Sequence, residues 1–167
     1  KRLLQVDSRN IPALHILGLI RASQDNHLEA VKLLKKAAAL EPSDPSLQYN
    51  LAKALSSAGN EKEALIHHQR AVKFMPQNPE AWLNYGKSLL ALNRHKEAAN
   101  TFDNALKING HYPEALLNKA IALRNLDNEN EALKFIDQAL ALHPGFYEGW
   151  LNKAISLKIL KRTEEAL

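Results

Sequence analysis

The chain has 167 residues, of which 46% are hydrophobic and 24% charged, the composition of an ordinary soluble protein. Its 22 basic and 18 acidic residues give a net charge of +4, and the basic residues are scattered among the acidic ones, so we expect no nucleic-acid partner. The lack of cysteine excludes disulfide frameworks, thiolate metal sites and cysteine nucleophiles.

Membrane and export signals are also missing from the sequence. No apolar run approaches the roughly 20 residues of a membrane span, and residues 1–7 have no signal-peptide pattern, so we expect a cytoplasmic protein with no membrane contact. The chain opens without Met and stops inside a helical pattern, and we therefore expect a piece of a longer protein.

Apolar residues at helical spacing, separated by turn and capping residues, predict an all-α chain of helix pairs. In chain order the predicted helices cover residues 1–7, then 11–24 and 27–40, 45–57 and 61–74, 79–91 and 95–108, 113–125 and 129–142, and 147–159 and 163 onward. The break inside each of the first four pairs carries turn or capping residues, namely Asp25-Asn26, Gly59-Asn60, Asn93-Arg94 and Asp127-Asn128.

These pairs repeat with a period of 34 residues, because Pro42 and Pro76 are 34 apart and Pro144 lies three periods beyond Pro42. At residue 110, the remaining position of this series, the chain has glycine instead of proline. Alanine keeps the same period in two series, Ala30, Ala64, Ala98, Ala132 and Ala166, and Ala37, Ala71, Ala105 and Ala139. A third series of small residues is Gly18, Ala52, Gly86, Ala120 and Ala154. We number each repeat from Ile11, Pro45, Pro79, Pro113 or Tyr147, which gives repeats 11–44, 45–78, 79–112, 113–146 and a truncated 147–167.

The repeats resemble the tetratricopeptide (TPR) family, whose pattern is W-x2-L-G-x2-Y, then A-x3-F, then P. The third repeat matches this pattern best, with Trp82, Tyr85, Gly86, Leu89, Ala98 and Phe102. Lys119 and Lys153 occupy a usually apolar position, and we expect their stems to be packed and their ammonium groups hydrated. The resemblance implies a single array over residues 1–167, a solenoid of antiparallel helix pairs in a right-handed superhelix, with the first helix of each pair lining a concave groove.

The residues of the concave face are expected at repeat positions 2, 6, 9 and 13, which share one stripe of the first helix. Position 6 holds asparagine in four repeats and Ile16 in the first. Asparagine is a weak helix former, whereas its amide can pair with the backbone of an extended peptide. The alternative is that each asparagine bridges to a neighbouring helix or faces water. The predicted groove residues are Asn50, Asn84, Asn118 and Asn152 at position 6, Glu80, Glu114 and Glu148 at position 2, and Lys53 and Lys87 at position 9.

Two resemblances bear on the partner. Asparagine at position 6 resembles peptide-binding TPR proteins, above all O-GlcNAc transferases. Chaperone-type TPR domains that clamp a C-terminal carboxylate share the position-6 asparagine but also need Lys or Arg at positions 2 and 6. Three repeats of this chain have glutamate at position 2, which would repel such a ligand, so it is not expected. An alternative role for the glutamates is to occupy the favourable first turn of a helix.

Enzyme signals are missing. None of the seven histidines has a metal-ligand spacing, no phosphate-binding loop or nucleophile elbow occurs, and no cofactor is expected. His68 falls at the normally apolar position 24 and is predicted to be a packed core imidazole, while Trp82 and Trp150 are predicted core residues. We therefore expect a non-enzymatic scaffold that binds a protein or peptide. The alternative is that the repeats form the substrate-recruiting or oligomerising arm of a larger enzyme, such as a bacterial O-GlcNAc-transferase-like glycosyltransferase. Exposed Ile155, Ile159 and Leu160 also predict association of copies through the array ends.

Overall fold

The computed structural model describes residues 9–160, and within this range every regular element is an α-helix. The predicted segments 1–7 and 163 onward, together with Ala166, lie outside the described residues. The chain forms two compact units, of which the first ends at Gln77 and the second begins at Asn78. This boundary lies one residue before the end of the second repeat. The single array over residues 1–167 stays a prediction.

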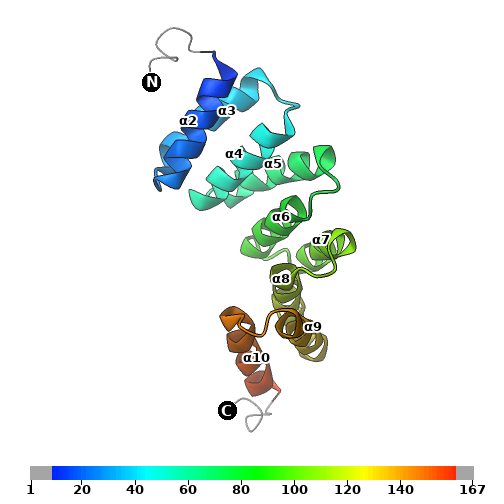
Figure 1. Ribbon diagram of the computed structural model, residues 1–167. Coiled ribbons are helices and arrows are strands. Elements are labelled where there is room, and N and C mark those ends of the chain that lie inside the picture. Colours follow the sequence, from blue (N-terminus) through cyan, green and yellow to red (C-terminus); the bar gives the residue numbers. More distant parts are fainter. Residues whose placement is uncertain (1–8, 161–167) are drawn as a thin grey trace. The chain divides into compact units, whose positions relative to one another are not determined.

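The first unit contains α2 (Ile11–Ser23), α3 (His27–Leu40), α4 (Pro45–Ser57) and α5 (Glu61–Phe74). Each helix packs on the next in the chain, and the two first helices, α2 and α4, also touch each other (Figure 1). The unit is therefore two stacked helix pairs.

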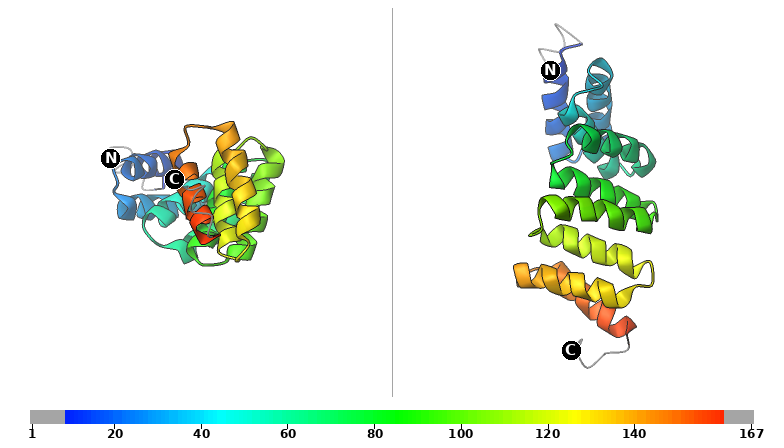
Figure 2. Two further views of the ribbon diagram at one scale, coloured as in Figure 1. Left: turned by 90° about the horizontal axis from the view of Figure 1, so that it is seen from below. Right: turned by 90° about the vertical axis from the view of Figure 1, so that its right-hand side faces the viewer.

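The second unit contains α6 (Pro79–Ala91), α7 (His95–Ile108), α8 (Pro113–Arg124), α9 (Glu129–Leu142) and α10 (Tyr147–Ile159). Its helices follow one another as layers (Figure 2), and α8 touches both α6 and α10. All predicted helices in the described range are confirmed, with bounds that differ by at most one residue. None of the helices in residues 9–160 has the length and apolar character needed to cross a membrane.

Local sequence accounts for the ends of these helices. The side chains of Asn10, Asp44 and Asn78 accept hydrogen bonds from the N–H groups of Ala13, Leu47 and Ala81, at 2.9, 2.8 and 3.1 Å, and so cap α2, α4 and α6. Inside each of the first four pairs the turn residue at repeat position 15 has a positive φ. These residues are Asp25, Gly59, Asn93 and Asp127, which are the types that adopt the left-handed region at least cost.

The alanine series marks the places where helices approach most closely. Every described member of both series is fully buried. A Cβ atom added to Gly18 would lie 2.8 Å from Leu34 Cγ, and one added to Gly86 would overlap the ring of Phe102. Because large side chains fill the space opposite, only small residues fit at these positions.

The core prediction for Trp150 is wrong, since this residue is 51% exposed. Its Nε1 instead donates a hydrogen bond to the carbonyl oxygen of Pro144 at 2.8 Å. Gln48, which has the same repeat position, donates in the same way to the carbonyl oxygen of Pro42 at 2.9 Å. Position 4 lies near the start of the first helix, so its side chain can reach back and fix the preceding loop.

Candidate functional site

The predicted binding residues of the second unit lie on its first helices, α6, α8 and α10. Glu80, Glu114 and Glu148 are exposed near the start of these helices, and Asn84, Asn118 and Asn152 are partly exposed one turn later. Lys87 is exposed on α6. We call this set the asparagine face. Since α8 touches both α6 and α10, the face continues from one first helix to the next.

The asparagine side chains of this face do not all make the same contacts. The Nδ2 groups of Asn118 and Asn152 donate to the backbone oxygens of Glu114 and Glu148, one turn earlier, at 2.7 and 2.8 Å. The Oδ1 atom of Asn152 accepts a hydrogen bond from Arg124 Nη2 on α8 at 2.9 Å. Asn152 therefore also bridges two first helices.

In the first unit, Asn50 Nδ2 lies 2.8 Å from Nε2 of His15 and so links α4 to α2. Lys53 is exposed, and its ammonium group lies over the ring of Tyr49, 5.3 Å from the centroid. The helix-bridging alternative thus describes contacts of both Asn50 and Asn152. Whether any of these residues binds a partner stays a prediction.

Negative charges at one edge of the asparagine face act on Tyr112, which lies in the loop before α8. Its pKa is raised mainly by burial, and then by the negative charges of Glu114 and Glu80. Two glutamates from neighbouring first helices therefore act on the same phenol.

The prediction of hydrated ammonium groups is wrong for Lys119, whose side chain is only 12% exposed. Its Nζ pairs with Asp103 on α7 at 2.6 Å and lies 4.0 Å from the centre of the Phe135 ring. Lys153 repeats the arrangement with Asp137 on α9 at 2.9 Å. Both lysines thus bind an aspartate of the preceding repeat, a pairing that was not anticipated because the aspartates precede them by 16 residues.

The first unit contains a buried polar cluster between α4 and α5. The core prediction for His68 is confirmed, since it is 1% exposed. Burial, together with the positive charges expected at His67 and Lys53, lowers the pKa of His68 to about 4. Ser56 Oγ lies 3.4 Å from His68 Nε2, and Nδ1 of His67 lies 2.7 Å from Oε1 of the buried Gln48. These contacts join side chains of α4 and α5, which indicates a structural role, while Nδ1 of the buried His68 has no hydrogen-bond partner among the described residues.

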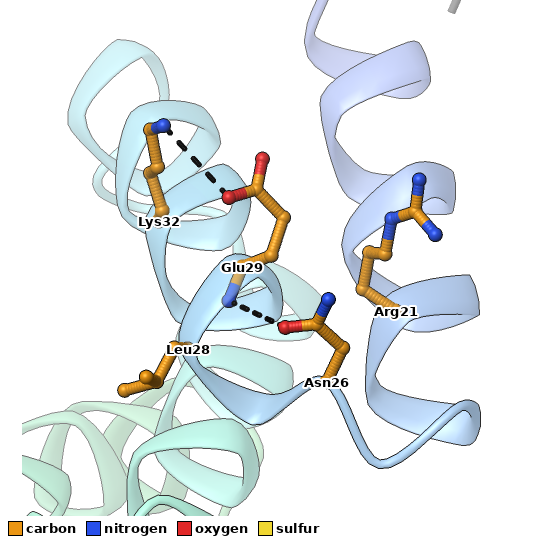
Figure 3. A pocket seen from close by; sticks show the side chains of 5 residues that line it. All are labelled: Arg21, Asn26, Leu28, Glu29 and Lys32. Atoms are coloured by element: carbon orange, nitrogen blue, oxygen red, sulfur yellow. Dashed lines mark hydrogen bonds and ion pairs between the residues drawn. The ribbon is translucent and has the colours of Figure 1, made fainter.

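A shallow depression of about 540 Å³ lies at the turn between α2 and α3, lined by Arg21, Asn26, Leu28, Glu29 and Lys32 (Figure 3). Its polar groups are engaged with neighbours. Asn26 accepts from the N–H of Glu29 at 3.3 Å, Lys32 lies 3.8 Å from the Glu29 carboxylate, and Arg21 donates to Gln24 at 2.8 Å. These contacts stabilise the end of α2 and the start of α3.

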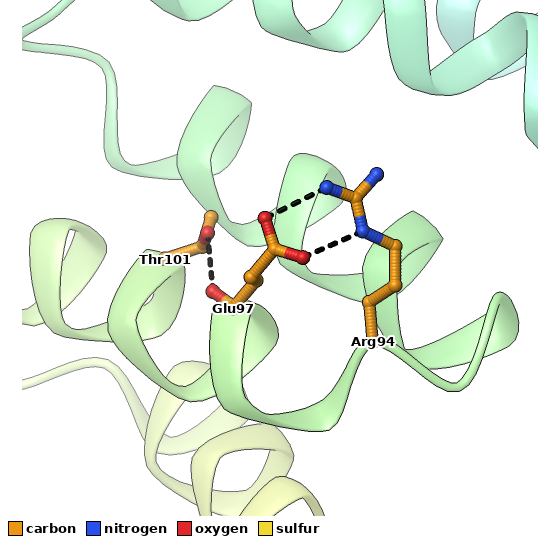
Figure 4. Close-up of polar contacts among 3 residues, drawn as sticks. All are labelled: Arg94, Glu97 and Thr101. Carbon is orange, nitrogen blue, oxygen red and sulfur yellow. Dashed lines mark hydrogen bonds and ion pairs between the residues drawn. The ribbon is translucent and has the colours of Figure 1, made fainter.

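The start of α7 is held by an exposed ion pair (Figure 4). Nε and Nη2 of Arg94 each donate to the Glu97 carboxylate at 2.7 Å, and this hydrogen bonding lowers the pKa of Glu97. Thr101 donates to the backbone oxygen of Glu97 at 2.7 Å. Over residues 9–160, no three His, Asp or Glu side chains are grouped so as to hold a metal ion.

Sequence comparison identifies the family. The family described as the cilia and flagella-associated protein 70 middle TPR-like domain matches residues 48–166, and a second family, described as tetratricopeptide repeat, matches residues 21–66. The chain belongs to the tetratricopeptide repeat family. A search of curated protein sequences gives no significant match for this TPR chain.

Solved structures show the same TPR fold at low sequence identity. MamA residues 41 to the end from Desulfovibrio magneticus RS-1 superpose with a TM-score of 0.86 at 17% identity, covering 93% of this chain and 88% of that one. YrrB, described as a TPR protein with an unusual peptide-binding site, gives 0.85 at 24% identity over 90% and 77% of the two chains. Pseudomonas aeruginosa PilF gives 0.78 at 22% identity over 91% and 69%. These likenesses establish the fold alone.

Proposed function

We propose that this TPR chain is a protein-binding scaffold whose asparagine face binds an extended segment of a partner protein. The observation that carries the proposal is the recurrence of a partly exposed asparagine on three successive first helices of one unit. Helix propensity does not favour asparagine at these positions. Asn50 and Lys53 would serve the same purpose on α4 of the first unit. The description of YrrB as a peptide-binding TPR protein agrees with this class of function.

Asn118 has the geometry that best suits such a contact. Its Nδ2 group is used on its own helix, by the 2.7 Å bond to the oxygen of Glu114. Its Oδ1 atom accepts no hydrogen bond from any residue between 9 and 160, and is therefore available to a partner N–H group. An extended chain offers one such N–H at every residue except proline. The Oδ1 atom of Asn152 is already bonded to Arg124, so we expect Asn152 to contribute less.

The charges of the face indicate a basic partner. Glu80, Glu114 and Glu148 are exposed and follow one another along the same edge, so their fields add at a nearby ligand. Beside the asparagines, position 9 carries Lys87 on α6 but the apolar Ile121 and Ile155 on α8 and α10. We therefore propose a segment whose basic side chains meet the glutamates and whose apolar side chains meet the isoleucines.

Selection of peptides from a random display library tests this function. We expect the selected peptides to be enriched in Lys and Arg and to bind more weakly to a Glu80→Gln/Glu114→Gln/Glu148→Gln variant. At about 0.2–1 kcal/mol for each exposed pair, the expected loss is about 3- to 150-fold at low salt, and it should shrink as salt is added.

The matched control removes the same number of charges away from the asparagine face, in a Glu97→Gln/Asp127→Asn/Glu131→Gln variant. We expect this variant to bind the selected peptides like the unmodified chain. Peptides that lose affinity for the control, and keep it for the asparagine-face variant, would contradict the proposal.

A further inference from the structure

The connection between α7 and α8 differs from the other connections between repeats. Its repeat position 32 holds Gly110, where the first, second and fourth repeats hold Pro42, Pro76 and Pro144. Gly110 follows Asn109, and this Asn-Gly dipeptide occurs nowhere else in the sequence. A glycine after an asparagine leaves its backbone nitrogen unshielded by any side chain.

The backbone does not require glycine at this point. Asn109, the residue directly after α7, has φ −132° and ψ 95°. These values are close to those of His143, which directly follows α9 and precedes Pro144, with φ −138° and ψ 86°. The φ angle of Gly110 lies outside the left-handed region, and a Cβ added there would have Leu106 O as its nearest neighbour, at 3.7 Å. The residue before Gly110 thus has the backbone conformation seen before Pro144, and no left-handed φ requires glycine in this loop.

The Asn109 side chain is folded back over the Gly110 peptide. The N–H of His111 donates to Asn109 Oδ1 at 3.1 Å, and the ring closed by this bond contains both the Asn109 Cγ and the Gly110 nitrogen. Asn109, Gly110 and His111 are all exposed, and among residues 9–160 the Gly110 N–H has no hydrogen-bond acceptor. A donor on Oδ1 stabilises negative charge that develops there when a nucleophile adds to Cγ.

We propose that Asn109 is a site of spontaneous deamidation through a cyclic imide with Gly110. The Gly110 nitrogen loses its proton and attacks Asn109 Cγ, forming a C–N bond. The bond from Cγ to Nδ2 then breaks, and ammonia leaves with the proton. Water adds to either carbonyl of the imide and opens it, which gives aspartate when the new C–N bond breaks and isoaspartate when the original peptide bond breaks.

This reaction replaces a neutral amide by a carboxylate in the loop that also contains Tyr112. The pKa of Tyr112 is already raised by burial and by Glu114 and Glu80, so the new charge joins an edge that is acidic before the change. It lowers the net charge of the chain by one from +4. The inference rests on the loop chemistry alone and is independent of the proposed binding function.

The test is to age the folded chain in mildly alkaline buffer and to map the tryptic peptide that follows Lys107 and ends at Lys119. This peptide contains Asn118 as an internal reference. We expect aspartate and isoaspartate to accumulate at Asn109 while Asn118 stays intact, with isoaspartate detected by a protein isoaspartyl methyltransferase. A Gly110→Pro variant, which has no backbone N–H to act as nucleophile, should show neither product.

Two outcomes would overturn the inference. One is an unchanged Asn109 in the folded chain when the same chain in urea is converted, because the fold would then protect the residue. The other is equal conversion in the Gly110→Pro variant, because the products would then arise without the Gly110 nitrogen. Circular dichroism of the variant shows whether its helices are retained.

Discussion

Acidification should destabilise the first unit mainly through the side chain of His68. Burial disfavours the imidazolium form, and the positive charges at His67 and Lys53 act in the same direction, so the pKa of His68 falls from 6.5 to about 4 in the folded chain. Between these two values the unfolded chain binds a proton that the folded chain does not. The stabilisation is therefore present above pH 6.5 and is lost as the pH falls toward 4.

The size of the effect follows from the two pKa values. At about 1.36 kcal/mol per pKa unit, the change from 6.5 to about 4 corresponds to about 3 kcal/mol, most of which is lost between neutral pH and pH 4.5. The pKa of His67 is lowered as well, mainly by burial and then by Arg70, so it adds to the same slope. Carboxylates elsewhere also titrate in this range, and a reference variant is needed to separate them.

His68→Leu provides that reference, since the same repeat position holds Leu34, Phe102 and Ile136 in the other repeats, all fully buried. The assay is the free energy of unfolding from urea titrations followed by circular dichroism, at neutral pH and near pH 4.5. We expect the unmodified chain to lose about 2–3 kcal/mol more than the variant over this interval. An equal loss in both chains would refute the assignment of the pH dependence to His68.

Three further predictions concern stability, each measured by urea or thermal unfolding. Gly86→Ala should cost about 1–3 kcal/mol, because the new Cβ would overlap the Phe102 ring, whereas Gly145→Ala, whose Cβ would meet only His143 Nε2 at 3.7 Å, should cost far less. Gly110→Pro should stabilise the chain by about 0.4–1 kcal/mol by restricting the unfolded state, and a loss of stability would show that the loop shape is not the one described. Lys119→Met should cost about 1–2 kcal/mol through loss of the Asp103 pair and the Phe135 contact. This cost should exceed that of Lys153→Met, because the Lys153 side chain is more exposed, and the reverse order would contradict this ranking.

The helices and turns of the described residues could be predicted because the residue types that specify them recur several times at the 34-residue period. Alanine at the close contacts, proline at the helix starts and Asn, Asp or Gly at the turns each reflect a local requirement that one repeat alone would suggest only weakly. The buried state of His68 followed from the same alignment of repeats.

The contacts of the candidate site could not be predicted in the same way. The pairing of Lys119 with Asp103 depends on how α8 packs on α7, and the bonds of Asn50 to His15 and of Asn152 to Arg124 depend on how neighbouring first helices approach each other. Identical asparagines at one repeat position therefore make different contacts, because the residues opposite them do not repeat. Trp150 could not be predicted either. Its repeat position is a core position in the TPR family, and yet its side chain is exposed.

An Asn84→Ala/Asn118→Ala variant tests the binding role of the asparagine face most directly, when affinity for a selected peptide and thermal stability are measured on the same protein. At about 0.5–1.5 kcal/mol for each hydrogen bond, we expect a 5- to 150-fold loss of affinity with little change in the melting temperature. The matched control, Asn100→Ala/Asn130→Ala on the exposed surfaces of α7 and α9, should bind normally. An asparagine-face variant that binds normally but melts early would contradict the account, because its asparagines would then hold helices together instead of a partner.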